Sequence, residues 1–361
     1  MRNEKIPVGI LGATGMVGQR FITLLANHPW FDVTCVAASS RSAGKTYAEA
    51  VHGRWNFKNP VPAHIGTLKV YDAVEEVAPV CKQVEFVFSA MSLDKEKVRA
   101  LEEQYAAHET PVVSNNSAHR WTKDVPMFIP EINHHHTALI DIQRKNRGWE
   151  KGFITAKPNC SIQSYVPILE ALKDYQPERA AVSTYQAISG AGKTFDTYPE
   201  ISDNIIPYIG GEEQKSEDEP LKIWGRISGG EIQLAESPII SATCVRVPVS
   251  DGHLVTVNLT LGREASREEL IEAINSCEDP IADMELPSSP SPFLKYFSEK
   301  DRPQTRLDRN FGDGMGIAVG RLREDPVLGW KFVALSHNTI RGAAGGAVLT
   351  AEMLVKKGYI E

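Results

Sequence analysis

Short apolar runs and helix-like segments alternate through the first part of the chain. Apolar runs occur at 6–11, 31–38 and 85–91, and a fourth, 110–117, ends in polar residues. A segment with apolar residues at helical spacing separates the first two runs, and a charged, helix-like segment separates the last two. Because strands that alternate with helices pair in parallel, this pattern predicts an α/β domain with a doubly wound, Rossmann-type parallel sheet.

The pattern changes near residue 155. A polar stretch at 133–151 is typical of a solvated helix at a domain boundary. Beyond it, apolar and polar residues alternate in the runs 180–190, 240–249 and 253–262. Such alternation is typical of a half-exposed antiparallel or mixed sheet. We therefore expect a second, α+β domain built on a mixed sheet.

The composition is that of a globular protein. The chain has 361 residues, 42% of them hydrophobic, and a net charge of −7. It has no window near ~18 consecutive apolar residues, no block of Lys and Arg, and five cysteines without a CxxC spacing. The N-terminus carries no signal-peptide pattern. We expect a cytoplasmic protein of about two domains, with reduced thiols and with no metal, nucleic-acid partner or membrane contact.

The first apolar run leads directly into a glycine-rich turn with the spacing GxxGxxG, and a helix follows. Glycines allow close approach of a pyrophosphate, and the helix start supplies free N–H groups. A plain tight turn is the alternative, but a position after the first strand favours a dinucleotide site. The candidate cofactor contacts are Gly12, Thr14, Gly15, Met16 and Val17.

The end of the second predicted strand bears on the choice of cofactor. NAD sites usually place an acidic residue there to bind the ribose. This chain has none, and instead presents Ser39, Arg41 and Ser42. Hydroxyls and a guanidinium suit a 2′-phosphate, so we predict NADP; a solvated turn is the alternative reading.

Cys160 stands where a helix is expected to begin, directly after Pro158 and Asn159. A thiol at a helix N-terminus faces the positive end of the dipole, so we expect its pKa to be lowered. The same N–H groups can hold an oxyanion formed when the sulfur attacks a carbonyl. The alternative is a buried structural cysteine, which is the interpretation we give to Cys35.

His253 is the candidate acid/base partner of this thiol. It follows a strand and a glycine turn, and Arg246, seven residues earlier, suits a substrate carboxylate. A satisfied surface histidine is the alternative. The run 134–136 consists of three histidines, but consecutive side chains on a helix point apart, so we do not predict a metal site there.

Three further segments carry polar side chains suited to a ligand. Gln186 ends a strand before a small-residue loop, where it could orient a carbonyl. Asn116 and Arg120 follow a strand's carboxyl end, where open α/β sheets bind ligands. Glu212 and Lys215 open a polar segment whose pattern alone favours an exposed helix start.

Together these segments resemble aspartate-β-semialdehyde dehydrogenases, and the branch is similar to the archaeal and fungal one. The resemblance runs through essentially the whole chain, in order. Its motifs are GATGMVGQRF, SSRSAGK, VVSN, PNCSIQ, TYQAISGAG, NIIPYIGGEEQK, RVPVSDGH, DRPQTRLDR and LSHNTIRGAAGGA.

The resemblance implies a reversible, NADP-dependent reductive dephosphorylation of L-4-aspartyl phosphate to L-aspartate 4-semialdehyde, in lysine, methionine, threonine and isoleucine biosynthesis. It implies an NADP-binding domain at 1–154 that the C-terminal helix within 340–361 completes. It also implies a catalytic and dimerisation domain at 155–339. The expected partners are this substrate and phosphate, and a second copy of the chain in a homodimer or homotetramer.

The resemblance also assigns roles. Cys160 would form the acyl-thioester, His253 would be its acid/base, and Gln186 would orient the acyl group. Arg246 would hold the substrate carboxylate, and Glu212 would meet the amino group. Phosphate would be held by Lys215, Arg120 and Asn116. The remaining cofactor contacts would be Ser89, Ser189, Gly190 and Asn338, of which Ser189 and Gly190 would lie beside the nicotinamide and Asn338 at its carboxamide.

Three alternatives stay open. Malonyl-CoA reductases share much of this scaffold, but Asn159 beside the thiol, which we add to the catalytic set, and Glu212 favour the semialdehyde enzyme. N-acetylglutamyl-phosphate reductases fit less well. The alternative from another class is a catalytically silent NADP-binding or redox-sensing protein. The joint presence of Cys160, Gln186, Arg246 and His253 argues against it.

Overall fold

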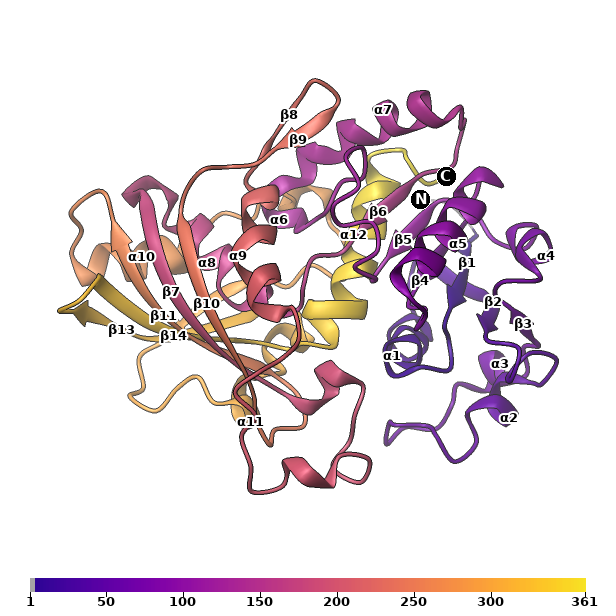
Figure 1. The fold of residues 1–361 in the computed structure, drawn as a ribbon, viewed down its shortest axis with the longest axis horizontal. Helices are drawn as coiled ribbons and strands as arrows, with labels where there is room; N and C mark the ends of the chain where they lie inside the picture. Colours follow the sequence, from indigo (N-terminus) through magenta and orange to yellow (C-terminus); the bar gives the residue numbers. More distant parts are fainter. Residues whose placement is uncertain (1–3) are drawn as a thin grey trace.

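The computed structural model describes residues 4–361 and shows two lobes (Figure 1). The N-terminal lobe is built on a six-stranded sheet in the order β3-β2-β1-β4-β5-β6, and all neighbouring strands are parallel. The strands are β1 Ile6–Leu11, β2 Phe31–Ala38, β3 Val70–Asp72, β4 Phe86–Ser89, β5 Val112–Ser114 and β6 Ile154–Ala156. This order is that of a doubly wound dinucleotide-binding sheet, which confirms the prediction.

The glycine turn shapes the start of the first helix in this lobe. Gly12 has a φ of +80°, and a Cβ there would lie 2.4 Å from the Ala90 carbonyl oxygen. A Cβ on Gly18 would lie 2.2 Å from the carbonyl oxygen of Gly12. Both positions therefore require glycine. The helices of the lobe are α1 Met16–Leu25, α2 Tyr47–Val51, α3 Ala63–Gly66, α4 Val77–Cys81, α5 Lys95–Ala107, α6 Pro130–Asn133 and α7 Ala138–Arg147.

Three strands of the first sheet end side by side. Leu11 pairs with Ser89, and Ser89 pairs with Ser114. The backbone N–H of Asn115 donates to the Ser89 carbonyl oxygen at 2.8 Å, so the polar residues after β5 stay at this edge. Carboxyl ends of parallel strands at a switch of direction are where such sheets bind ligands.

The stretch at 133–151 is less solvated than its polarity predicts. Gln143 on α7 is fully buried, donating to the Asp124 and Ile154 carbonyls and accepting from the Ile154 N–H at 2.6 Å. His136 is also buried and lies 2.9 Å from the carbonyl oxygen of Gly225. These polar side chains face inward because each satisfies backbone groups there, which a hydropathy pattern cannot show.

The second lobe is built on a mixed sheet in the order β10-β7-β11-β14-β13-β12, as expected. The pairs β10–β7 and β12–β13 are parallel, and the other three are antiparallel. Its strands are β7 Pro177–Gln186, β10 Ile239–Arg246, β11 His253–Leu261, β12 Leu294–Phe297, β13 Ile317–Asp325 and β14 Gly329–Ser336, and a hairpin joins β8 Arg226–Ser228 to β9 Glu231–Gln233. Its helices are α8 Val166–Ala171, α9 Glu212–Ile223, α10 Arg267–Asn275 and α11 Thr305–Asp308.

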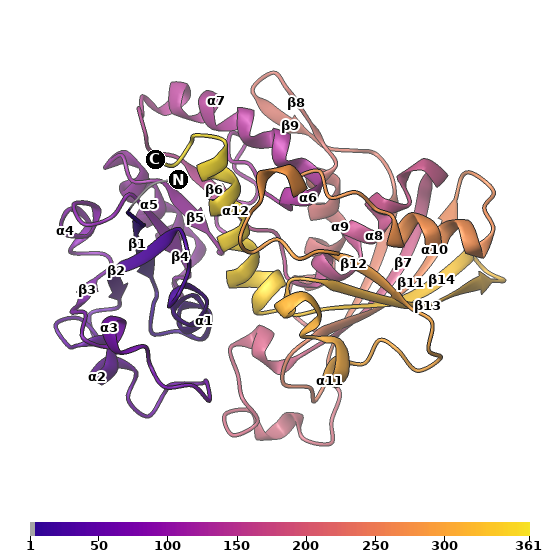
Figure 2. The same cartoon turned by 180° about the vertical axis from the view of Figure 1, so that it is seen from behind.

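Alternate residues of this sheet face a hydrophobic core. In β7, Ala180, Val182, Thr184 and Gln186 are buried, while Ala181 and Tyr185, which alternate with them, are exposed. The apolar residues of α8 and α10 belong to the same core, and both helices lie against this face of the sheet (Figure 2). The alternation read from the sequence therefore corresponds to a sheet buried on one side.

The C-terminal helix, α12 Gly345–Lys356, lies between the lobes (yellow in Figure 1). Val348, Leu349 and Leu354 of this helix share one hydrophobic core with Ile6 and Phe21 of the first lobe. The chain thus returns from the second lobe to fill the core of the first.

Candidate active site

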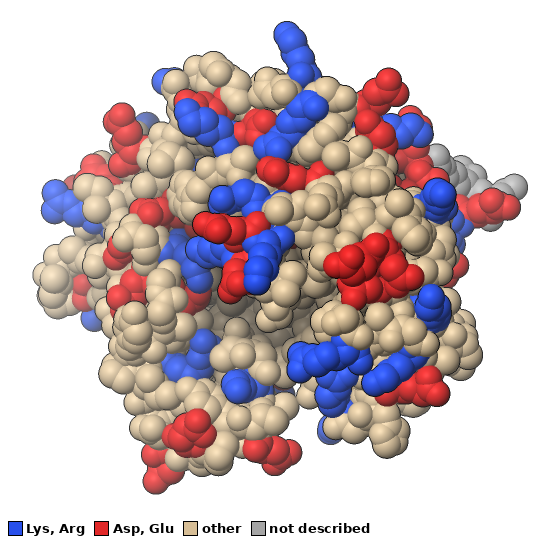
Figure 3. All heavy atoms as spheres, turned by 45° about the vertical axis from the view of Figure 1, so that its right-hand side comes forward, with Lys and Arg blue, Asp and Glu red and all other residues tan. Residues whose placement is uncertain are grey.

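A cavity of about 450 Å³ lies between the lobes, at the carboxyl edge of the first sheet. The surface is hollowed near the middle of the face drawn in Figure 3, and Lys and Arg beside the hollow are interspersed with Asp and Glu. Residues from both lobes line the cavity. Those predicted from the sequence are Val17, Asn116, Arg120, Asn159, Cys160, Gln186, Ser189, Gly190, Glu212, Lys215, Arg246 and Asn338.

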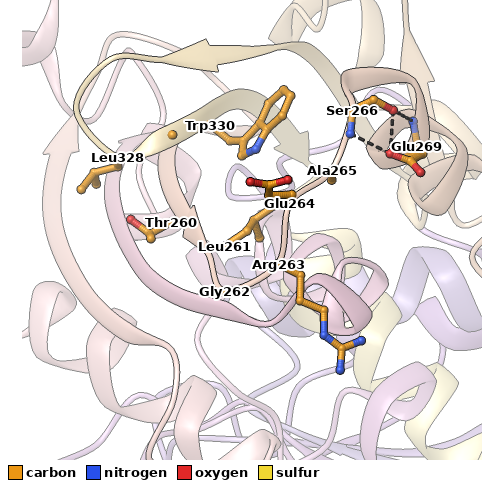
Figure 4. Close-up of a pocket in the computed structure, with 11 residues that line it drawn as sticks. Thr260, Leu261, Gly262, Arg263, Glu264, Ala265, Ser266, Glu269, Leu328 and Trp330 are labelled. Atoms are coloured by element: carbon orange, nitrogen blue, oxygen red, sulfur yellow. Dashed lines mark hydrogen bonds between the residues drawn. The ribbon is translucent and has the colours of Figure 1, made fainter.

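A larger hollow of about 640 Å³ lies where β11 ends and β14 begins in the second sheet (Figure 4). Three of its polar side chains already have partners in the protein. Ser266 Oγ and backbone N–H donate to Glu269, which donates its own N–H back to Ser266 Oγ, and Arg263 donates to the Asp174 carbonyl. This reciprocal pair caps α10. Size therefore does not identify the site, whereas the chemistry of the inter-lobe cavity does.

Cys160 lies at the start of a short 3₁₀ helix, Ser161–Ser164, and its thiol is partly exposed to the inter-lobe cavity. Its Sγ is 3.3 Å from His253 Nε2, which joins the two residues that the sequence pairs as nucleophile and acid/base. Gly342 makes this arrangement possible, because a Cβ there would lie 2.7 Å from the Cβ of Cys160. A thiol and an imidazole at this separation form a unit suited to nucleophilic attack.

The imidazole of His253 is oriented by a hydrogen bond on the ring nitrogen that faces away from the sulfur. It is fully buried, and its Nδ1 accepts a hydrogen bond from the Ala187 backbone N–H at 3.1 Å. Because Nδ1 is an acceptor, the neutral ring carries its proton on Nε2, which faces the sulfur. Burial, with a smaller contribution from the Arg246 guanidinium, lowers the pKa of His253 to about 3. The ring is therefore neutral at physiological pH and presents a donor to the thiol.

The predicted lowering of the Cys160 pKa is wrong. Burial, and to a smaller extent the Glu212 carboxylate, raise the pKa of this thiol to about 12. The cations that act in the opposite direction are Arg120, Arg246 and Lys215. The single 3₁₀ turn after the thiol has too few aligned peptides to outweigh the loss of solvation.

The rate of alkylation of Cys160 by iodoacetamide tests this pKa. We expect the rate to rise about tenfold per pH unit between pH 7 and 9, since only the thiolate reacts and its fraction stays far from saturation. Mass spectrometry of the labelled peptide measures it, and Cys160→Ala gives the background from the other four cysteines. A rate that levels off below pH 8.5 contradicts the raised pKa.

Glu212, predicted from pattern to be exposed, is buried at the start of α9 and faces the cavity. Its carboxylate accepts hydrogen bonds from Lys215 Nζ at 2.7 Å, from Asn159 Nδ2 at 2.9 and 3.0 Å, and from Gln186 Nε2 at 3.3 Å. Burial alone would raise its pKa, but Lys215 and these hydrogen bonds lower it below the usual value. The group is an anion that ties together the side chains beside Cys160.

Arg246 is buried at the end of β10, and its Nη1 donates to the Ala187 carbonyl oxygen at 2.7 Å. Gly190 leaves room for it: a Cβ there would lie 3.0 Å from Arg246 Nη1 and 3.1 Å from His253 Nε2. The loop that follows Gln186 therefore packs its backbone against both side chains. The guanidinium stands at the wall of the cavity beside the imidazole, where a carboxylate can reach it.

Arg120 and Asn116 form the opposite wall. Arg120 Nε donates to the Lys157 carbonyl oxygen at 2.8 Å. Asn116 Nδ2 donates to Ser89 Oγ and to a carboxylate oxygen of the buried Glu102, each at 3.0 Å. Ser89 is fully buried and lies behind this wall, so it supports Asn116 and does not line the cavity.

The structure divides the predicted cofactor residues into two groups. Ser189, Gly190, Asn338 and Val17 line the cavity, and Asn338 Nδ2 donates to Ser189 Oγ at 2.8 Å while its Oδ1 accepts from the Gly252 N–H. Met16 lines an adjoining cavity of about 190 Å³ with Ser189. The others lie outside both cavities: Gly12, Thr14, Gly15, Ser39, Arg41, Ser42 and Ser89.

Sequence reasoning missed two residues that shape the site. Glu219 bonds both Arg120 and the backbone of Asn159, and Gly342 packs against Cys160. Glu219 lies seven residues after Glu212, two helical turns along the same face, so the helix spacing could have indicated it. Nothing in the sequence could have brought Gly342 to the thiol.

Comparison with known families accounts for both lobes. Residues 7–140 match the family described as "Semialdehyde dehydrogenase, NAD binding domain", and residues 167–341 match "Semialdehyde dehydrogenase, dimerisation domain". The chain is 44% identical over 355 residues to the aspartate-semialdehyde dehydrogenase of Archaeoglobus fulgidus, covering 98% of this chain and 99% of that one.

The chain is also similar to solved structures of aspartate-semialdehyde dehydrogenases. The aspartate-semialdehyde dehydrogenase of Candida albicans with NADP superposes with a TM-score of 0.87 at 36% identity, over 99% of this chain and all of that one. A Vibrio cholerae aspartate-semialdehyde dehydrogenase II complexed with ASA superposes with a TM-score of 0.74 at 27% identity. The match covers 98% of this chain and 99% of that one.

The fold and the two matched domains define an NAD(P)-dependent oxidoreductase of the semialdehyde dehydrogenase class. Within that class, the chain belongs to the aspartate-semialdehyde dehydrogenase family, with relatives of 40–44% identity in archaea and fungi. It has aspartate-semialdehyde dehydrogenase activity in the biosynthesis of the aspartate family of amino acids. The family is the one that the motifs resemble, and not that of the malonyl-CoA reductases.

Proposed function

We propose that this enzyme interconverts L-4-aspartyl phosphate and L-aspartate 4-semialdehyde, with NADP and phosphate, through a thioester on Cys160. The observation that carries the proposal is the 3.3 Å contact between Cys160 Sγ and His253 Nε2 at the wall of a cavity that both lobes line. Around that contact stand an anion, Glu212, and cations on either side, as a zwitterionic acyl phosphate requires.

The substrate has three charged groups, and the cavity offers a partner for each. We assign the α-carboxylate to Arg246 and the amino group to Glu212. The acyl phosphate is assigned to Lys215, Arg120 and Asn116. Gln186, which contacts Glu212 at 3.3 Å, is left to orient the acyl carbonyl. Asn159, whose backbone precedes the thiol, aligns Glu212 through its amide.

The residues of the first lobe fit a dinucleotide. Gly12 and Gly18 bring the backbone close at the start of α1, where a pyrophosphate binds free N–H groups. Ser189 and Gly190 are assigned to the nicotinamide side of the cavity, with Asn338 behind them. When bound, NADPH supplies a hydride to the acyl carbon. The lobe that carries the glycine turn, 1–154 with 340–361, would hold the cofactor, and 155–339 would carry the catalytic groups.

The thiol and the imidazole then act in sequence. The Cys160 sulfur attacks the acyl carbon, the C–O bond to phosphate breaks, and phosphate leaves from beside Arg120 and Lys215 with the proton of the thiol. The Nε2–H of His253 donates a hydrogen bond to the sulfur as negative charge develops there. After reduction of the thioester, the same N–H protonates the oxygen of the reduced carbon, and the proton returns to Nε2 as the aldehyde is released; the sulfur leaves as thiolate and regains a proton from water.

A spectrophotometric assay tests the proposal. NADP reduction with aspartate semialdehyde should require inorganic phosphate, because phosphate is the group that removes the acyl chain from Cys160. NADPH oxidation with malonyl-CoA serves as the control reaction. Phosphate-independent NADP reduction, or activity with malonyl-CoA alone, would overturn the substrate assignment.

Arg41 is exposed just beyond β2 and is assigned to the 2′-phosphate of NADP with Ser39 and Ser42. We expect Arg41→Ala to raise the KM for NADP about 5- to 50-fold and to leave that for NAD within about twofold, because only NADP carries the phosphate. Steady-state kinetics with both cofactors measure this, and Arg306→Ala, an exposed arginine on the other lobe, is the matched control. Equal weakening of both cofactors would contradict the assignment.

We also propose that the enzyme is a cytoplasmic homodimer or homotetramer. The second lobe matches a dimerisation domain, and Tyr185 and Ile239 are exposed on one face of its sheet. The cysteines at positions 4–361 are unpaired, as suits a reducing compartment. Over the same residues, no helix has the length and apolarity needed to cross a bilayer. Analytical ultracentrifugation distinguishes the two assemblies.

A further inference from the structure

Glu219 is a fully buried carboxylate on α9, at the junction of the two lobes. Each of its oxygens accepts one short hydrogen bond. Oε1 accepts from Arg120 Nη1 at 2.8 Å, and Oε2 accepts from the backbone N–H of Asn159 at 2.6 Å. One side chain therefore joins an arginine of the first lobe to the backbone N–H of the residue directly before Cys160.

These contacts leave a defined edge of the Arg120 guanidinium for a ligand. Its Nε is used by the Lys157 carbonyl and its Nη1 by Glu219. Across residues 4–361, Nη2 makes no hydrogen bond to the protein, and Arg120 lines the cavity. The guanidinium has five donors in a rigid plane, so fixing two of its nitrogens orients the third.

A second side chain of the same helix holds the backbone of this arginine. Lys222 Nζ donates to the Arg120 carbonyl oxygen at 2.5 Å and to the Val125 carbonyl oxygen at 3.0 Å. Glu212, Glu219 and Lys222 project from one side of α9, so a single rigid element places the Glu212 carboxylate in the cavity and holds both the guanidinium and the backbone of Arg120. The helix thereby fixes the position of Arg120 relative to Cys160.

We propose that Glu219 is a positioning residue for the reaction: it aims Arg120 at phosphate and fixes the peptide of Asn159 beside the thiol. The inference rests on the proposed function. A carboxylate suits this place because it can accept from two donors at once. Glutamine offers one oxygen only, and its NH₂ group would face a donor that is itself buried, so one of the two contacts must be lost.

The test is the variant Glu219→Gln, assayed in the direction of NADP reduction. We expect the KM for phosphate to rise about 10- to 100-fold, kcat to fall, and the KM for NADP to stay within about twofold, because the glycine turn is untouched. The concentration of phosphate that protects Cys160 from iodoacetamide should rise by a similar factor, which reports phosphate binding without turnover.

Glu217→Gln is the matched control. Glu217 lies on the same helix and also accepts a backbone N–H, that of Ala242 at 2.9 Å, but it does not line the cavity. Glu217→Gln should leave unchanged both the KM for phosphate and the concentration of phosphate that protects Cys160 from iodoacetamide. The double variant Glu219→Gln/Arg120→Ala should bind phosphate no more weakly than Arg120→Ala alone, since Glu219 acts through the arginine.

The outcomes separate the two proposals. If the unmodified enzyme needs no phosphate, the proposed function fails. If it needs phosphate and Glu219→Gln leaves the KM for phosphate within twofold while lowering only the melting temperature, Glu219 is structural and this inference is overturned. Should Glu219→Gln not fold, Glu219→Asp keeps the charge with a shorter reach. An unchanged KM for phosphate in that variant also overturns the inference, and a raised one supports it.

Discussion

Cys160→Ala is expected to lower kcat by at least about 10⁴-fold, the loss typical when a covalent nucleophile is removed. No other thiol can replace it: Cys35 and Cys244 are buried away from the cavity, and Cys81 and Cys277 do not line it. Binding of NADPH should stay within about twofold of the unmodified enzyme, because the glycine turn belongs to the other lobe. Steady-state assay and fluorescence titration measure the two effects.

Two controls sharpen this expectation. Cys81→Ala changes a half-buried thiol outside the cavity and should leave both kcat and cofactor binding unchanged. Cys160→Ser keeps the shape of the site and should retain cofactor binding with little turnover. Residual turnover of Cys160→Ala within tenfold of normal would exclude the thioester, and loss of NADPH binding would exclude the division of labour between the lobes.

His253→Ala should lower kcat by about 10²- to 10⁴-fold, the usual range for loss of a general acid or base. The KM for semialdehyde should change little, since we assign the charged ends of the substrate to Arg246 and Glu212. Steady-state kinetics of NADP reduction measure both quantities. The exposed His64 provides the control, because His64→Ala should be neutral.

The double variant Cys160→Ala/His253→Ala probes whether the pair works as one unit. It should be no slower than Cys160→Ala, because an imidazole that acts only on the thiol and its adduct has nothing left to act on. Additive losses would show that His253 has a role independent of the sulfur.

Local patterns were enough to predict the fold. Strand and helix periodicity predicted the parallel sheet, and alternation such as Ala180, Val182 and Thr184 predicted the half-buried mixed sheet. The glycine turn could be found because Gly12 and Gly18 leave a sequence signature of their backbone contacts. These features depend on neighbours along the chain, which a sequence displays directly.

The rest of the site depends on residues far apart in the chain. The pKa of Cys160 is set by burial and by Glu212, 52 positions later, and not by the local helix start that the sequence suggests. Glu219 meets Arg120, its partner 99 positions earlier, only when the lobes are assembled. Resemblance to a known family supplied candidate roles for the cavity residues, but it gave no indication of the hydrogen bond that fixes the His253 tautomer.

The return of α12 into the first lobe has a consequence for biosynthesis of the polypeptide itself. Ile6 and Phe21 leave the ribosome long before Val348 and Leu354, and the core that they share stays open until those two residues have been translated. The apolar core residues of the nascent N-terminal lobe therefore stay exposed while some 300 further residues are added. The core of the first lobe is thus completed only after α12 has been synthesised, and chaperones that shield exposed apolar segments have a long interval in which to act.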